Sequence, residues 1–148
     1  MKITSTVFQH NQDIPSIYTC DGENINPPLS FLDVPESAKS LVLIVDDPDA
    51  TIGTFTHWVV FNIDPKVKEV LENSIPEGGA EIQTDFGISG YGGPCPASGK
   101  HRYFFKLYAL KTLLALSENA NKKMVEDAML EHIIDSAEII GLYSRSNK

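Results

Sequence analysis

Three short runs of aliphatic, β-branched and aromatic residues interrupt an otherwise polar, turn-rich sequence of 148 residues. They occupy residues 41–45, 57–63 and 103–110, and polar, proline or glycine residues flank each of them. Such runs are typical of buried β-strands, because branched and aromatic side chains pack well on a pleated surface. The sequence therefore predicts a mainly β core with long irregular segments between the strands.

Weaker patterns predict the elements around these strands. The alternation of residues 3–7 favours a short first strand. Residues 11–37 are rich in Pro, Asn, Asp and Ser, which favours extended turns. Residues 66–73 are expected to form a short helix.

The C-terminal third predicts one clear helix followed by a strand. Residues 121–133 place apolar side chains at helical spacing, and Asn119 or Asn121 can cap the helix. Over residues 134–143, β-branched residues and a glycine favour a last strand rather than a longer helix. The expected fold class is a mainly β, two-sheet antiparallel sandwich with one or two peripheral helices, formed by residues 1–148 as a single domain.

The charge of the chain excludes some classes of partner. It carries 20 acidic and 12 basic residues, which gives a net charge of −8 at pH 7. Such a surface repels nucleic acid and anionic membranes at long range, but it leaves room for a local anion pocket. No apolar run predicts a membrane span and no signal peptide is visible, so a cytoplasmic location is expected.

The chain has two cysteines, Cys20 and Cys95. Two are too few for a disulfide framework, and their spacing is not that of a zinc site. In a cytoplasmic protein their thiols are expected to be reduced.

Polar side chains that could carry chemistry gather at the ends of the predicted strands. They are Asp47, Asp49, His57, His101, Arg102 and Tyr103. Strand alternation predicts that His101 and Tyr103 share one face of their strand. It also places His57 on the same face as Val59 and Phe61.

Residues 86–100 form a loop with five glycines and two prolines. Glycines are costly to order, and such loops let backbone N–H groups approach a ligand. The loop fails the common motifs, because Pro94 and His101 do not fit a P-loop. Cys95 does not fit a dinucleotide-binding fingerprint, and Tyr91 does not fit a nucleophile elbow.

Two separated motifs nevertheless resemble a known family. Residues 47–50 read Asp-Pro-Asp-Ala and are followed by Gly-Thr-Phe-Thr-His-Trp at residues 53–58. Residues 90–96 read Gly-Tyr-Gly-Gly-Pro-Cys-Pro and are followed by His-Arg-Tyr at residues 101–103. With these motifs the sequence resembles the phosphatidylethanolamine-binding proteins, also called Raf kinase inhibitor-like proteins, in their shorter bacterial and archaeal form.

The resemblance implies a β-sandwich with a small anion pocket at one end. The ligand-binding residues that it implies are Asp47, Asp49, His57, Gly92, Gly93, Pro94, His101 and Tyr103. The histidine rings, the tyrosine hydroxyl and the backbone N–H groups of the glycine stretch can donate to a phosphate-type anion. One of the carboxylates can accept from a histidine and fix its tautomer, or can pair with the ammonium group of a ligand.

The implied function is a non-enzymatic binding protein for phosphate or phosphoethanolamine-type ligands, without a cofactor, a metal ion or a catalytic residue. One alternative is a serine protease inhibitor that inserts an exposed loop, for which residues 50–56 and 76–90 are candidates. The other is a small hydrolase that uses the Asp and His cluster. A protein partner and a homodimer are also compatible with the resemblance.

Some positions depart from the family pattern. Thr51 and Ala97 stand where proline is common, and the chain lacks the C-terminal extension of the animal members, so kinase regulation is not expected. The resemblance also leads us to expect that Cys20 and Cys95 lie close together in space.

Overall fold

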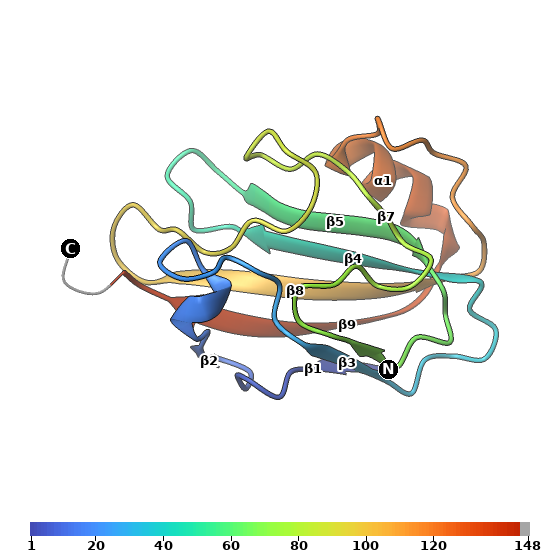
Figure 1. The fold of residues 1–148 in the computed structure, drawn as a ribbon. Helices are drawn as coiled ribbons and strands as arrows, with labels where there is room; N and C mark the ends of the chain where they lie inside the picture. The colour runs from blue at the N-terminus through green and yellow to red at the C-terminus, as the bar shows by residue number, and fades with distance from the viewer. Residues whose placement is uncertain (146–148) are drawn as a thin grey trace.

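The computed structural model describes residues 1–145, so the last three residues of the predicted domain lie outside the described part of the chain. The described residues form nine strands, one α-helix and two 3₁₀ turns (Figure 1). The strands are β1 (Lys2–Thr4), β2 (Gln12–Asp13), β3 (Leu29–Leu32), β4 (Ser40–Asp47), β5 (Phe55–Ile63), β6 (Glu69–Val70), β7 (Ala80–Glu81), β8 (His101–Leu110) and β9 (Ile133–Tyr143). The helix is α1 (Lys122–Met129), and the 3₁₀ turns are η1 (Ser16–Tyr18) and η2 (Leu130–His132).

The strands are arranged in two sheets. The small sheet has the order β1-β3-β6, and the large sheet has the order β2-β9-β8-β4-β5-β7. All pairs of neighbouring strands are antiparallel except β2 and β9, which are parallel. The predicted two-sheet, mainly β fold is therefore confirmed, with one parallel pair as a departure from a fully antiparallel arrangement.

Strand β4 is the centre of the large sheet, and the core covers both of its faces. Every residue from Ser40 to Asp47 is buried. On one face Leu43 packs with residues of the small sheet, and on the other Ile44 packs with residues of α1. A strand that is covered on both faces reads as a continuous apolar run, which explains why the sequence predicted it clearly.

The predicted helix at residues 66–73 is wrong. The Val67 N–H donates to the Asp64 carbonyl oxygen at 3.0 Å in a turn, and Glu69–Val70 then pairs with β3. Val67 and Val70 are only 7% and 3% exposed and belong to the core between the sheets. This tertiary burial outweighs the weak local preference for a helix.

Three other predicted segments are close to the structure. Residues 11–37 are largely irregular, as expected, but they also contain β2, η1 and β3. Asn121 is the helix cap, and its side chain accepts a hydrogen bond from the Met124 N–H at 2.9 Å. Residues 134–143 lie within β9, which confirms the last strand.

The two cysteines are joined by a disulfide, with their Cα atoms 5.4 Å apart. Their predicted proximity is confirmed, whereas the expectation of reduced thiols is wrong for this structure. The Cys20 N–H also donates to the Pro94 carbonyl oxygen at 3.1 Å. The segment after η1 is thus attached twice to the glycine-rich loop.

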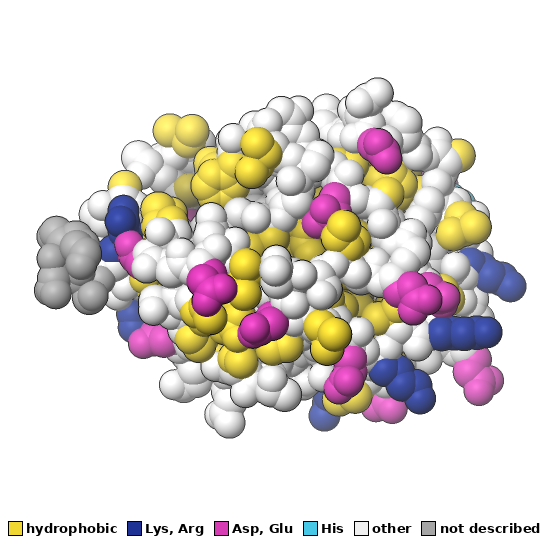
Figure 2. Space-filling model, in the orientation of Figure 1, with side chains coloured by type: hydrophobic (Ala, Val, Ile, Leu, Met, Phe, Trp, Pro, Cys, Tyr) yellow, Lys and Arg dark blue, Asp and Glu magenta, His cyan; other side chains and the backbone are white. Residues whose placement is uncertain are grey.

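Acidic side chains are spread over the face that Figure 2 shows rather than gathered in one patch. Among residues 1–145, no helix has the length and apolar character that crossing a membrane requires.

Candidate functional site

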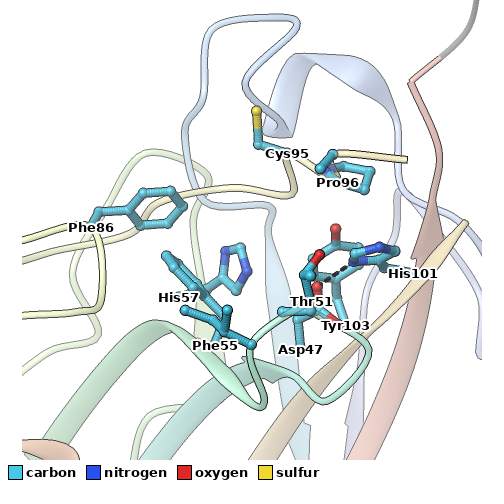
Figure 3. Close-up of a pocket in the computed structure, with 12 residues that line it drawn as sticks. Asp47, Thr51, Phe55, His57, Phe86, Cys95, Pro96, His101 and Tyr103 are labelled. Carbon is cyan, nitrogen blue, oxygen red and sulfur yellow. Dashed lines mark hydrogen bonds and ion pairs between the residues drawn. The ribbon is translucent and has the colours of Figure 1, made fainter. Parts of the chain in front are cut away.

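A pocket of about 300 Å³ opens where β4 ends and where β5 and β8 begin. These three strand ends meet because β4 is antiparallel to both of its neighbours. Figure 3 shows His57 and Phe86 on one side of the pocket, His101 and Tyr103 on the other, and Pro96 across its upper edge. The lining residues are Asp47, Ala50, Thr51, Ile52, Phe55, His57, Phe86, Cys95, Pro96, Ala97, His101 and Tyr103.

Four of the eight expected site residues line this pocket, and four do not. The lining residues are Asp47, His57, His101 and Tyr103. The other four, Asp49, Gly92, Gly93 and Pro94, are not part of the lining.

Asp47 and His101 form a hydrogen-bonded pair at the edge of the pocket. The Asp47 Oδ2 atom lies 2.7 Å from Nδ1 of His101, and Nε2 of the same ring lies 3.1 Å from the Ser98 carbonyl oxygen. Both ring nitrogens therefore face oxygen atoms of other residues. Because both nitrogens are engaged, His101 is not a free donor for an anion, contrary to the expectation from sequence.

Asp49 has a different partner from the one expected. It holds Arg102 through two side-chain hydrogen bonds of 2.9 and 2.8 Å, and its own N–H donates to Asp47 Oδ1 at 2.7 Å. The hydrogen bonds from Arg102 lower the pKa of Asp49 to about 2. Asp47, rather than Asp49, is thus the carboxylate that accepts from a histidine. Asp49 instead connects the turn after β4 to Arg102 of β8.

A β-bulge turns His57 toward the pocket. Val45 pairs with Trp58 and Asp46 pairs with Thr56, so β5 has one extra residue at His57. Because of the bulge, the His57 ring contacts the Tyr103 ring, with centroids 5.2 Å apart, on the face opposite to Val59. The predicted shared face with Val59 and Phe61 is therefore wrong, since simple alternation does not hold across a bulge.

The glycine-rich loop holds the His57 residue instead of offering free N–H groups. The Gly92 N–H donates to the His57 carbonyl oxygen at 3.0 Å, and the Gly92 carbonyl oxygen accepts from His57 Nδ1 at 2.7 Å. The Gly93 N–H donates to Asn24 Oδ1 at 2.8 Å. Both amides expected to bind a phosphate are therefore already used within the protein.

His57 is a neutral ring with one unused nitrogen. Burial lowers its pKa, although the Gly92 carbonyl and the carboxylates of Asp47 and Asp46 oppose this effect. Since Nδ1 donates to a carbonyl, the neutral ring carries its lone pair on Nε2. No hydrogen-bond partner of Nε2 is found among residues 1–145.

We expect His57 to make the protein less stable in mild acid. Below pH 6.5 the unfolded chain takes up a proton on His57 that the folded protein resists, so the free energy of unfolding falls as pH falls. The variant His57→Gln should lose this part of the pH dependence between about pH 6.5 and 5. Urea titrations of both proteins over this range measure the slopes, and equal slopes would contradict a neutral His57.

Tyr103 places an unpaired hydroxyl against the pocket. The residue is 1% exposed, and its hydroxyl has no hydrogen-bond partner of ordinary geometry among residues 1–145. Burial, followed by the Asp47 carboxylate, raises the pKa of Tyr103, while the nearby backbone N–H of Cys95 opposes the shift slightly. The phenol therefore keeps its proton and can donate it to a ligand.

The sequence did not predict the apolar walls of the pocket. Phe55 lies 5.1 Å from the His57 ring and 4.8 Å from the Phe86 ring, measured between centroids. Ile52, at the tip of the turn after β4, is 91% exposed at the rim. The available signal was two aromatic residues: Phe55 lies within the first motif, two residues before His57, and Phe86 is the first residue of the glycine-rich loop.

No group of three or more His, Cys, Asp or Glu side chains placed to hold a metal ion occurs in the part of the chain that the structure describes. The pocket can therefore offer a donor from Tyr103, an acceptor from His57 and an apolar rim.

Comparison with known proteins assigns the chain to a family. The family profile described as phosphatidylethanolamine-binding protein matches residues 4–144. The chain belongs to the phosphatidylethanolamine-binding protein family. The resemblance seen in the sequence motifs is thus confirmed.

Relatives and solved structures agree with this family over nearly the whole chain. A UPF0098 protein of Methanothermobacter thermautotrophicus is 51% identical, covering 98% of this chain and 99% of its own length. The crystal structure of a putative phosphatidylethanolamine-binding protein homologue from Chlamydia trachomatis has a TM-score of 0.94 at 41% identity, over 98% of this chain and 97% of that one. The Escherichia coli protein YbcL, described as a member of the mammalian family, has a TM-score of 0.90 at 31% identity and covers 98% of both chains.

Proposed function

We propose that this member of the phosphatidylethanolamine-binding protein family binds a small phosphate-type anion, such as phosphate or phosphoethanolamine, without catalysing a reaction. The observation that carries the proposal is the Tyr103 hydroxyl, which is buried at the pocket without a partner. Leaving a buried donor unpaired is costly, so a ligand oxygen that accepts from it gains binding energy. The family is named after a ligand with a phosphate-bearing head group, which supports a phosphate-type ligand for this chain.

The surrounding residues position the pocket rather than contact the anion. Asp47 and Asp49 fix His101 and Arg102, and Gly92 fixes His57. These hydrogen bonds connect residues of both sequence motifs around the pocket.

Removing the Tyr103 hydroxyl should weaken anion binding strongly. A hydrogen bond to a charged group contributes about 1.5–3 kcal/mol, so Tyr103→Phe should raise the dissociation constant for phosphoethanolamine roughly 10- to 100-fold. The unliganded variant should be as stable as the wild type or slightly more stable, because an unpaired buried hydroxyl is lost. NMR titration and thermal melts give the two quantities.

Tyr108→Phe is the matched control, since Tyr108 lies on the same strand but outside the pocket. It should leave the dissociation constant unchanged. If phosphoethanolamine binds Tyr103→Phe as tightly as the wild type, the pocket does not hold the anion in the proposed way.

Neither alternative function has a specific observation in its favour. Both candidate inhibitor loops contain tight turns, whereas insertion into a protease cleft needs an extended segment. In residues 50–56 the Gly53 N–H donates to the Ala50 carbonyl oxygen at 3.2 Å, and in residues 76–90 the Gly79 N–H donates to the Pro76 carbonyl oxygen at 3.0 Å. For a hydrolase, Cys95 offers no thiol nucleophile because it forms the disulfide with Cys20. Both carboxylate oxygens of Asp47 already accept hydrogen bonds within the protein. We therefore propose no reaction for the Asp and His cluster.

The cytoplasmic location also remains a proposal, and the disulfide provides its test. Disulfides are rare in reducing cytosol, except inside hyperthermophiles. Alkylation of Cys20 and Cys95 in intact cells, followed by mass spectrometry, should show free thiols if the protein resides in a reducing cytoplasm. Sedimentation of the purified protein would show whether it also forms the homodimer considered above.

A further inference from the structure

A second cavity, of about 500 Å³, lies beside the glycine-rich loop and shares no lining residue with the pocket described above. The segment before β3, the turn after β6 and strand β7 contribute to its walls together with the loop. Its lining residues are Asn24, Ile25, Asn26, Asn73, Ser74, Ile75, Glu81, Gly90 and Tyr91. Among residues 1–145, Glu81 is the only charged residue of this lining.

The Glu81 carboxylate is half-buried and has no cationic partner in the described part of the chain. Its Oε2 atom accepts a hydrogen bond from Nε1 of Trp58 at 2.7 Å, and Trp58 is fully buried. Neither a salt bridge to Glu81 nor a hydrogen bond to its Oε1 atom is found within residues 1–145. A partly buried charge is screened less by water than an exposed one, so a cation that reaches Oε1 gains binding energy.

Gly90 keeps this carboxylate open to the cavity. A Cβ atom at position 90 would lie 3.5 and 3.6 Å from the two carboxylate oxygens of Glu81, so a side chain there would lie against the carboxylate. The φ of Gly90 is +104°, which residues other than glycine rarely adopt. The backbone conformation of the loop thus leaves the approach to Glu81 free of a side chain.

The buried Asn26 side chain holds one wall of the cavity in place. Its Nδ2 atom donates to the Leu71 carbonyl oxygen at 3.1 Å, and its Oδ1 atom accepts from the Ser74 N–H at 2.9 Å. The Asn73 N–H donates to the Asn26 carbonyl oxygen at 3.1 Å. The Asn73 side chain, which has no hydrogen-bond partner among residues 1–145, therefore belongs to a preformed wall and can supply an amide oxygen.

We infer that this cavity binds a primary alkylammonium group. Oε1 of Glu81 and the amide oxygen of Asn73 accept from two of its three N–H donors. The apolar side chains of the lining, Ile25, Ile75 and Tyr91, pack against its alkyl chain. This cation site is separate from the anion pocket and does not depend on the proposed function.

Other cations match the cavity less well. A guanidinium binds a carboxylate best through both oxygens, but Trp58 already engages Oε2 of Glu81. Ca²⁺ takes about 6–8 oxygen ligands, and the residues that the structure describes contain no group of three or more acidic, His or Cys side chains placed to hold a metal. The net charge of −8 attracts every cation to the surface, so the test must separate this cavity from general attraction.

The single tryptophan of the chain reports on the site, because the Trp58 N–H and the bound ammonium share the Glu81 carboxylate. In an NMR titration, butylammonium should shift the indole ¹H–¹⁵N resonance of Trp58 with a saturable dependence on concentration. Butylguanidinium should need concentrations at least about fivefold higher. Tetramethylammonium, which has no N–H donor, should cause no saturable shift.

Glu81→Gln is the main variant, since it removes the charge and keeps an oxygen that can accept from Trp58. It should raise the dissociation constant for butylammonium about 10- to 100-fold, as expected for the loss of a hydrogen bond between charged groups. Glu36→Gln is the matched control, because Glu36 is exposed and lines neither cavity. It removes the same charge and should leave the dissociation constant unchanged.

In case Glu81→Gln does not fold, Asn73→Gly provides a second test at an exposed position. Asn73 has a φ of +54°, which glycine adopts readily, so the substitution removes the amide without straining the backbone. The dissociation constant for butylammonium should rise about 2- to 10-fold, because one hydrogen bond is lost.

The outcomes are specific to the cation site. Equal weakening by Glu81→Gln and Glu36→Gln, a saturable shift with tetramethylammonium, or no shift with butylammonium would overturn the inference. A shift that Ca²⁺ produces at lower concentration than butylammonium, or that inorganic phosphate reverses, would also overturn it. None of these results bears on the anion pocket, which Tyr103→Phe tests separately. Tighter binding of a lysine-containing peptide would support the same chemistry and place the ammonium group on a partner protein.

Discussion

Reduction of the Cys20–Cys95 disulfide should lower the free energy of unfolding by about 4 kcal/mol. The two cysteines are 75 positions apart, and a cross-link of this length removes a large number of conformations from the unfolded chain. For a domain of this size, a loss of about 4 kcal/mol corresponds to a decrease in melting temperature of roughly 8–16 °C.

Thermal melts with and without a reducing agent measure this decrease. Cysteine alkylation must confirm that the bond is reduced, and Cys95 is exposed enough to be attacked. The double variant Cys20→Ser/Cys95→Ser is the control, since it should melt at the lower temperature and not respond to the reducing agent. If the reduced protein has the same melting temperature as the oxidised protein, the disulfide contributes little to stability.

Reduction should change anion binding much less than it changes stability. Besides the disulfide, two hydrogen bonds hold the glycine-rich loop in place. The Cys20 N–H donates to the Pro94 carbonyl oxygen at 3.1 Å, and the Tyr91 hydroxyl donates to the Tyr18 carbonyl oxygen at 2.8 Å. Well below the melting temperature these bonds keep Pro96 near its place over the pocket. The disulfide is therefore expected to stabilise the fold rather than to define the site.

The strands could be predicted where burial in the core requires a recognisable run of apolar residues. The run at residues 41–45 is apolar throughout because β4 is covered on both faces, and its short length and β-branched residues favour a strand over a buried helix. In contrast, β6 has only two residues, and the sequence around Val70 does not show that a core lies over it. A helix was predicted there because only local preferences can be read from such a segment.

The site was predicted less completely than the fold. The motifs identified the pocket-lining Asp47, His57, His101 and Tyr103, but they did not show which groups remain free to bind. The amides of Gly92 and Gly93 were expected to hold the anion, yet acceptors distant in the chain already use them. Competition of this kind depends on the three-dimensional arrangement, and the identities of the donor residues alone do not reveal it.

Substitution of Gly93 by alanine should destabilise the protein by at least about 3 kcal/mol, the upper end of the usual cost of overpacking. A Cβ atom at this position would lie 2.3 Å from the Tyr18 carbonyl oxygen and 2.6 Å from Asn24 Oδ1. The facing atoms belong mainly to a backbone segment that the Cys20–Cys95 disulfide holds in place, so it cannot move aside cheaply.

Gly99→Ala on the same loop is the graded control. Gly99 has a φ of +71°, and a Cβ atom added there would meet no other atom within 4 Å, so only backbone strain of about 1–2 kcal/mol is expected. Urea unfolding of both variants tests this order of stability. A smaller loss of unfolding free energy for Gly93→Ala than for Gly99→Ala would contradict the close approach of the two segments.

Because Gly93 lies between the residue that fixes His57 and the cysteine that lines the pocket, Gly93→Ala should also weaken phosphoethanolamine binding, whereas Gly99→Ala should affect it less. Loss of stability and loss of binding are expected to coincide at Gly93. The close contact of Gly93 with Tyr18 and Asn24 also holds the neighbouring Gly92, which positions the His57 ring, and Cys95, which lines the pocket.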